Sequence, residues 1–113
     1  MCMKMTMKDI VSINKEYDEG IVINEGSMLF ALESIKKSQD WTEQVSYLVR
    51  ALLVDHVFKD GNKRTATHLI VSMLERQGFE FHPENIQKLV IGVSKDNVSD
   101  IKEIKKRITL EIY

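Results

Sequence analysis

The sequence contains few of the residues that cross-link, kink or punctuate a chain. Its 113 residues include one cysteine, one proline and five glycines, and aromatic residues make up only 7%. The single cysteine, Cys2, excludes an intrachain disulfide and favours a reducing, cytoplasmic setting. The near absence of proline leaves room for helices, because proline disrupts their interiors.

Long hydrophobic runs and an excess of charge are also missing. No stretch approaches the ~20 apolar residues that would span a bilayer, and the Met1–Met7 segment lacks the apolar core of a secretory signal. The net charge of −1 lacks the basic excess typical of nucleic-acid-binding proteins. We therefore expect a cytoplasmic protein with a single domain over residues 1–113, no membrane association and no direct nucleic-acid binding.

What the sequence does have is apolar residues at helical spacing, which predicts an all-α bundle of about six helices. The β-branched segment Ile21–Ile23 is expected to be extended but too short to found a sheet. The expected helices run from about Met7 to Tyr17, from a Ser27 N-cap to Lys37, from an Asp40 N-cap to about Asp55, from an Asn62 N-cap to Gln77, from Pro83 to a break at Asp96, and over a last segment with Ile101, Ile104 and Ile108.

Functional side chains are concentrated in the connector His56–Arg64, between two helices with strongly apolar faces. The second of these helices starts here, and the unpaired N–H groups and positive partial charge of a helix start attract phosphate. Gly61 would let the backbone approach an anion closely, while Lys63 and Arg64 would add two cations. Cations at this position oppose the helix dipole, a cost that a bound anion would offset.

His56 and Asp60 supply groups for chemistry on such a phosphate. Imidazole is the usual general base near neutral pH, and Mg²⁺ commonly binds one or two carboxylates together with substrate phosphates. Taken singly, His56 could be a capping or surface histidine and Asp60 a turn residue. Together with the anion cradle, they predict attack of a hydroxyl group on a nucleotide phosphate. The other histidines, His68 and His82, form no zinc-binding signature with His56.

The run His56-x-Phe58-x-Asp60-Gly61-Asn62-Lys63-Arg64 resembles the active-site motif of the Fic/Doc (Fido) family. That motif is His-x-Phe-x-(Asp/Glu)-(Ala/Gly)-Asn-(Gly/Lys)-Arg, and every specified position matches. The resemblance extends over roughly residues 8–95. It implies a helical bundle with a short flap, ATP as co-substrate, Mg²⁺ as cofactor, and transfer of part of the ATP molecule to a protein hydroxyl.

The resemblance also implies a role for each residue of the motif. His56 would be the catalytic general base, Phe58 a buried anchor of the loop, and Asp60 the Mg²⁺ ligand. Further residues would bind the phosphates or form a flap that aligns the target protein by strand addition. The phosphate-binding residues would be Gly61, Asn62, Lys63 and Arg64, and the flap residues Ile21, Val22, Ile23 and Asn24.

Two positions separate the branches of this family. AMP-transferring members generally carry proline after the histidine and glycine before the final arginine, where this chain has Val57 and Lys63. Lysine is typical of the Doc-like (death-on-curing) branch, in which it accompanies a reversed nucleotide pose and phosphoryl transfer. We therefore expect phosphoryl transfer, with AMP transfer or a degenerate, non-catalytic nucleotide-binding partner as alternatives. The Doc-like branch also implies a toxin that is paired with a small antitoxin protein, and suggests a translation factor similar to elongation factor Tu as the target.

Overall fold

The structure, a computed structural model, describes residues 4–112, so Cys2 and the first residues of the Met1–Met7 segment lie outside the described part. Within it the chain forms six helices and no extended strand beyond an isolated antiparallel bridge between Val22 and Phe58. The expected all-α fold is confirmed. The helices are α1 (Met7–Asn14), α2 (Glu25–Lys37), α3 (Trp41–Leu53), α4 (Asn62–Arg76), α5 (Pro83–Lys95) and α6 (Ile101–Thr109).

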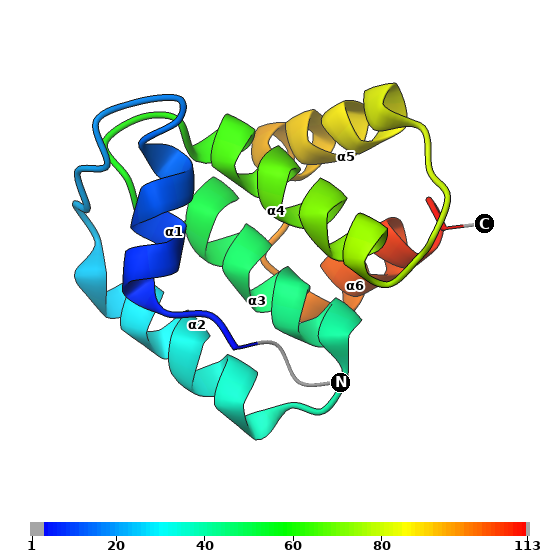
Figure 1. Cartoon of the computed structure of the whole chain (residues 1–113), viewed down its shortest axis with the longest axis horizontal. Coiled ribbons are helices and arrows are strands. Elements are labelled where there is room, and N and C mark those ends of the chain that lie inside the picture. The colour runs from blue at the N-terminus through cyan, green and yellow to red at the C-terminus, as the bar shows by residue number, and fades with distance from the viewer. Residues whose placement is uncertain (1–3, 113) are drawn as a thin grey trace.

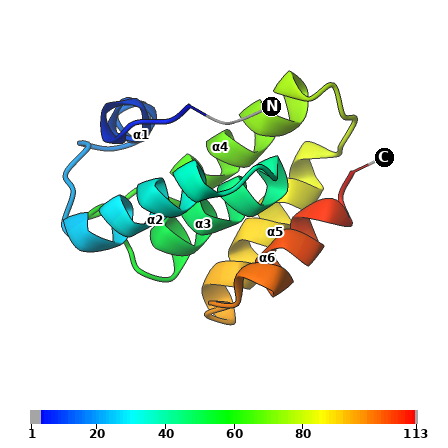
Figure 2. The ribbon, with the colours of Figure 1, turned by 90° about the horizontal axis from the view of Figure 1, so that it is seen from below.

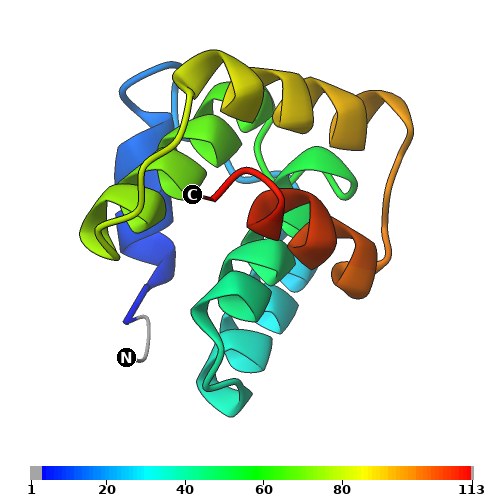
Figure 3. The same ribbon diagram turned by 90° about the vertical axis from the view of Figure 1, so that its right-hand side faces the viewer.

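The central helix of the bundle is α3, which packs against α2, α4 and α6 (Figure 1). Helix α4 packs in turn against α1 and α5, so that α1 lies at one margin of the bundle and α5 and α6 at the other (Figure 2). Viewed from the side, α6 crosses α3 at an angle and α5 passes over the end of the bundle (Figure 3). None of the described helices is long and apolar enough to cross a membrane.

The core is built from the apolar stripes that the sequence shows. The side chains of Leu48, Leu52, Leu69, Leu74 and Ile104 are at most 1% exposed. Burying one such side chain stabilises the fold by about 1.5–3 kcal/mol. Because α3 has neighbours on three sides, even Gln44 and Ser46 on this helix are buried, and their side chains bond to backbone carbonyls.

Helices α1 and α2 have boundaries that differ from those that the sequence predicts. Helix α2 begins earlier, because Asn24, not Ser27, is its N-cap: the Asn24 side chain accepts the Ser27 backbone N–H. Helix α1 ends at Asn14 and not at Tyr17, since the Asn14 carbonyl accepts the N–H groups of Tyr17 and Asp18 in a closing turn. Both shifts bring asparagine side chains to the connections that carry the functional groups.

The connections 15–24 and 54–61 lie side by side at one end of the bundle, at the upper left of Figure 1. The antiparallel bridge between Val22 and Phe58 joins them. The segment that is expected to be a flap is therefore in contact with the segment that is expected to be catalytic. The helices α1, α2, α3 and α4 all begin or end at this junction.

Candidate active site

A cavity of about 440 Å³ opens where these two connections meet. It contains most of the motif residues, together with side chains from the turn after α1, from α3 and from α5 that sequence reasoning did not select. The cavity is lined by Tyr17, Asp18, Leu53, His56, Lys59, Asp60, Gly61, Asn62, Lys63, Arg64 and Ser94. The structure therefore brings the predicted base, carboxylate and phosphate-binding residues to one solvent-accessible site.

The start of α4 faces this cavity without a side-chain cap. The N-cap position is Gly61, in a left-handed conformation (φ 78°), so the predicted Asn62 N-cap is wrong. Within the described chain, the backbone N–H groups of Asn62, Lys63 and Arg64 have no hydrogen-bond acceptor; the first such bond is donated by Thr65 to the Gly61 carbonyl. With two exposed cations and no acidic residue in its first turn, the helix start is a strongly electropositive group of donors.

The side chain of Asn62 closes the motif loop onto itself. Its Oδ1 accepts the Phe58 N–H at 3.0 Å, and its Nδ2 donates to the Phe58 carbonyl at 2.9 Å. The Phe58 side chain is 0% exposed, in the hydrophobic core. With its amide occupied in this way, Asn62 offers a phosphate its backbone N–H. Asn62, which the sequence predicts to be the N-cap, instead joins the Phe58 backbone to the helix start.

Gly61 is closely enclosed by residues of α1 and the turn that follows it. A Cβ atom at Gly61 would lie 2.9 Å from Nδ2 of Asn14 and 3.1 Å from Cβ of Asp18. Asn14 cannot withdraw easily: it is 0% exposed, and its Nδ2 donates to the Asp60 carbonyl at 3.0 Å and to the Thr65 hydroxyl at 3.1 Å. Both the left-handed φ and this close contact require glycine here.

Asn14 is thus a buried polar hub that sequence reasoning missed. In addition to those two bonds, its Oδ1 accepts the Gly20 N–H at 2.8 Å. One side chain therefore links α1, the segment that leads to Ile21, the loop at Asp60 and the first turn of α4. No local signal marks it, because the partner at Asp60 is 46 residues away in the sequence.

His56 lies in the connection beyond the end of α3 with an exposed side chain that lines the cavity. Its neighbour Val57 is fully buried, which fixes the backbone on that side. The His56 imidazole forms no hydrogen bond with another described residue. The ring nitrogens are therefore accessible to a ligand in the cavity.

Two carboxylates, Asp60 and Asp18, line the cavity beside the helix start. Asp60 Oδ1 accepts the Gly61 N–H at 2.8 Å, which holds the carboxylate at the loop. No cluster of three or more His, Cys, Asp or Glu ligands occurs among residues 4–112. The pair nevertheless fits the chemistry of Mg²⁺, which takes one or two carboxylate ligands and completes its shell with phosphates and water.

The segment Ile21–Asn24 is paired with the motif loop on one edge only. The Ile23 N–H donates to the Val57 carbonyl at 2.8 Å, and the Lys59 N–H donates to the Ile21 carbonyl at 2.9 Å. The N–H and carbonyl of Val22 have no backbone partner among the described residues. The side chains of Ile21 and Ile23 are 39% and 61% exposed. An unpaired edge with exposed apolar side chains is suited to strand addition.

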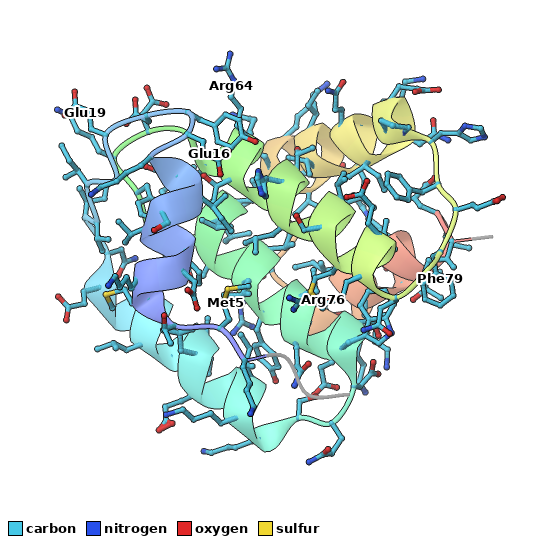
Figure 4. All side chains as sticks on the ribbon, viewed as in Figure 1. Met5, Glu16, Glu19, Arg64, Arg76 and Phe79 are labelled. Carbon is cyan, nitrogen blue, oxygen red and sulfur yellow. The ribbon has the colours of Figure 1, made fainter. Side chains whose placement is uncertain are left out.

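A second, larger cavity of about 750 Å³ extends from the first along α4 and α5. Tyr17, Lys63 and Arg64 line both cavities, whereas His56 and Asp60 line only the first. The Tyr17 hydroxyl is 2.7 Å from Nδ1 of His68, which lines the second cavity. Figure 4 shows the Arg64 side chain projecting outward from the start of α4. The second cavity is lined by Tyr17, Lys63, Arg64, Thr67, His68, Val71, Ser72, Glu75, Gln87, Val90 and Ile91.

Comparison with known proteins adds no assignment to this geometry. No protein-family model matches the chain. Neither a curated protein nor a solved structure matches it significantly. The functional argument therefore rests on the residues and the arrangement of the site.

Proposed function

We propose that this protein is a Doc-like member of the Fic/Doc family that transfers the γ-phosphoryl group of ATP to a hydroxyl group of a target protein. The observation that carries the proposal is the shared cavity of His56 and the uncapped start of α4. A cluster of backbone N–H groups with Lys63 and Arg64 beside it is suited to a polyphosphate. An unoccupied imidazole in the same cavity is suited to proton removal.

In the proposed reaction, His56 accepts the proton of the target hydroxyl as that oxygen attacks the γ-phosphorus. The bond between the γ-phosphorus and the bridging oxygen breaks, and ADP leaves. Backbone N–H groups of the α4 start and the cations at 63 and 64 stabilise the negative charge of the phosphoryl group in transfer. Asp60, with Asp18 as a second carboxylate, would hold Mg²⁺, which supplies charge neutralisation on the phosphates.

The second cavity supports γ- over α-phosphate transfer. Its Val71, Val90 and Tyr17 side chains suit the nucleoside, and Glu75 and Gln87 offer hydrogen-bonding groups for its polar edges. It adjoins the first cavity at Lys63 and Arg64 and includes neither His56 nor Asp60. A nucleoside seated there would direct the phosphate chain toward His56 with the terminal phosphate nearest the base. AMP transfer would need the α-phosphate in that place.

The partners belong to the same proposal. We propose that the exposed edge of Val22, flanked by Ile21 and Ile23, aligns a segment of the target, a translation factor of the elongation factor Tu type. A small antitoxin protein would suppress the activity in the cytoplasm. The support for the target edge is its unpaired backbone; the antitoxin is proposed from the sequence motif alone.

The test is transfer of label from ATP labelled at either the α- or the γ-phosphate, with Mg²⁺, to purified elongation factor Tu and to proteins of a cytosolic extract. We expect protein-bound label from γ-labelled ATP and none from α-labelled ATP. Label from the α position would replace phosphoryl transfer by AMP transfer.

His56→Ala is the variant that tests catalysis by this site. Loss of general-base catalysis typically lowers a rate by about 10²–10⁴-fold, so labelling should fall to near background while ATP binding persists. Unchanged labelling would refute the assigned base. Nucleotide binding by wild-type protein without labelling of any target would favour the non-catalytic nucleotide-binding alternative.

A further inference from the structure

His56 has a backbone conformation that needs external support. Its φ is 50°, in the left-handed region that residues other than glycine rarely adopt. Such a conformation persists where the surrounding structure holds it in place. The supports of the two flanking peptide units therefore determine where the imidazole points.

Asn24 of the flap binds the backbone on both sides of His56. Its side-chain Nδ2 donates to the Asp55 carbonyl at 3.1 Å, and its backbone N–H donates to the Val57 carbonyl at 3.2 Å. The Ile23 N–H adds a second bond to the same Val57 carbonyl. The carbonyls of the residues before and after His56, Asp55 and Val57, are thus held by Asn24 and its neighbour.

The backbone N–H groups of the two residues that flank His56 are held by α3. The N–H groups of Asp55 and Val57 donate to the carbonyls of Arg50 and Ala51, each at 3.2 Å. These bonds tie the loop to the helix end, but they come from the same chain segment as His56 itself. Asn24 is the side chain that supplies a bond from outside that segment.

Asn24 is itself held firmly, because it is the N-cap of α2. Its Oδ1 accepts the Ser27 N–H at 3.3 Å, while its Nδ2 is directed to Asp55. The oxygen and the nitrogen of the Asn24 side-chain amide therefore have separate roles. The oxygen begins a helix, and the nitrogen holds the peptide unit before His56.

We propose that Asn24 is a positioning residue that keeps His56 in its left-handed conformation and so aims the imidazole at the phosphate cradle. The proposal rests on the assignment of His56 as the general base. It also joins target alignment to catalysis. A target strand on the outer edge of Val22 would pair with the same short segment that carries Asn24.

The separable duties of the amide define the test. Asn24→Asp retains an oxygen for the α2 cap but replaces the donor to Asp55 with an acceptor, and Asn24→Ser retains a capping oxygen without a new charge. We expect each variant to lower the maximal rate of γ-phosphate labelling about tenfold or more, since small misplacements of catalytic groups are that costly. The ATP concentration for half-maximal rate should change by less than about twofold.

A second readout does not depend on the reaction. The ¹³Cα and ¹³Cβ chemical shifts of His56 report on its backbone conformation and should move in both variants. Asp40→Ala is the control, because it removes the N-cap of α3 at the end of that helix opposite the His56 loop. It should lower stability while leaving the His56 shifts and the labelling rate unchanged.

The outcomes separate this inference from the proposed function. Wild-type labelling rates and unchanged His56 shifts in both Asn24 variants would overturn the positioning role and leave the general base intact. An equal rate loss in Asp40→Ala would also overturn it, because the effect would then follow stability. Shifted His56 signals in the Asn24 variants, with no labelling even by wild-type protein, would support the structural link and refute the proposed reaction.

Discussion

The starts of α3 and α4 differ in what surrounds their unpaired backbone N–H groups and positive partial charge. At α3, the Asp40 side chain accepts the Thr42 N–H and hydroxyl and is also paired with Lys105, and Glu43 places negative charge in the first turn. At α4, the N-cap is a glycine without a side-chain acceptor, and the first turn carries cations.

The difference supports the proposal that the α4 start binds a ligand. The α3 start is satisfied by the chain itself, so it contributes to stability and needs nothing else. The α4 start retains unpaired donors and charges that oppose the helix dipole, at a cost of about 0.3–1 kcal/mol for each charge. A polyphosphate in the adjacent cavity would satisfy both the donors and the charges.

The largest effect on stability is expected from adding a side chain at Gly61, the N-cap position of α4. Gly61→Ala would place a methyl group against Asn14 and Asp18 at a positive φ, and we expect a loss of unfolding free energy of about 3 kcal/mol. Gly78→Ala is the matched control: its φ is also 78°, but nothing lies within 4 Å of the added Cβ. That variant should lose only about 1 kcal/mol.

Urea denaturation of the two alanine variants measures this difference. Equal losses would mean that the enclosure by Asn14 contributes nothing and that only the left-handed φ demands glycine. We also expect Gly61→Ala to bind ATP weakly at temperatures where it is folded. Gly78→Ala should bind ATP like the wild-type protein, because it lies at the far end of α4.

A smaller effect is expected from removing a cation at either end of α4. The loss at the helix start should weaken ATP binding, and the loss at the helix end should lower stability. Arg64→Gln should weaken ATP binding about tenfold or more through the loss of charge-assisted hydrogen bonds. It should leave stability unchanged or raise it by a few tenths of a kcal/mol, because a cation is removed from the helix start.

Arg76→Gln is the control at the last turn of the same helix, where a cation favours the dipole (Figure 4 labels both arginines). This variant should lose a few tenths of a kcal/mol and leave ATP binding unchanged. Isothermal titration with ATP and Mg²⁺, together with urea denaturation, gives both quantities. If Arg64→Gln lost stability and bound ATP normally, the α4 start would be an ordinary solvated helix end.

The comparison also shows how far local sequence signals extend. The Asp40 cap, the end of the fourth helix near Gln77 and the Pro83 helix start are all predicted correctly, because each signal and its partner lie within one helical turn. The six-helix fold follows from the apolar spacing for the same reason. Local structure can be predicted from the sequence when the interacting groups are neighbours in the chain.

The details of the site were less predictable because their partners are distant in sequence. Asn62 is a good N-cap by type, yet it clasps Phe58, and Asn14 is a buried hub only because Asp60 lies beside it. The partner of the Ile21–Ile23 segment is the motif loop, which the sequence cannot reveal without the packing of α1 against α4. Tyr17, Asp18, Leu53 and Ser94 belong to the cavity for the same non-local reason.

The smallest effect concerns the pH dependence of the closed start at α3. The Lys105 ammonium, followed by hydrogen bonds from Thr42, lowers the pKa of Asp40 from 3.8 to about 2. Because the folded-state pKa is depressed, the stabilisation is complete above pH about 4 and is lost as the pH falls toward about 2. Both partners are about 40% exposed at their side chains, so the pair should contribute at most about 1 kcal/mol.

Asp40→Asn isolates this contribution, since the amide keeps an oxygen that can cap α3 but carries no charge. We expect the stability difference between wild-type and Asp40→Asn protein to be present at pH 7 and 4 and to be clearly smaller at pH 2.5, because it disappears only as the pH falls through the folded-state pKa of about 2. Urea denaturation at pH 7, 4 and 2.5 measures that difference and cancels the other carboxylates. If the difference stayed constant with pH, Asp40 would stabilise the protein only through its N-cap hydrogen bonds. The negative charge of Asp40 would then contribute nothing at the α3 start. That outcome would weaken the contrast with α4, where the cations and the missing cap occur together.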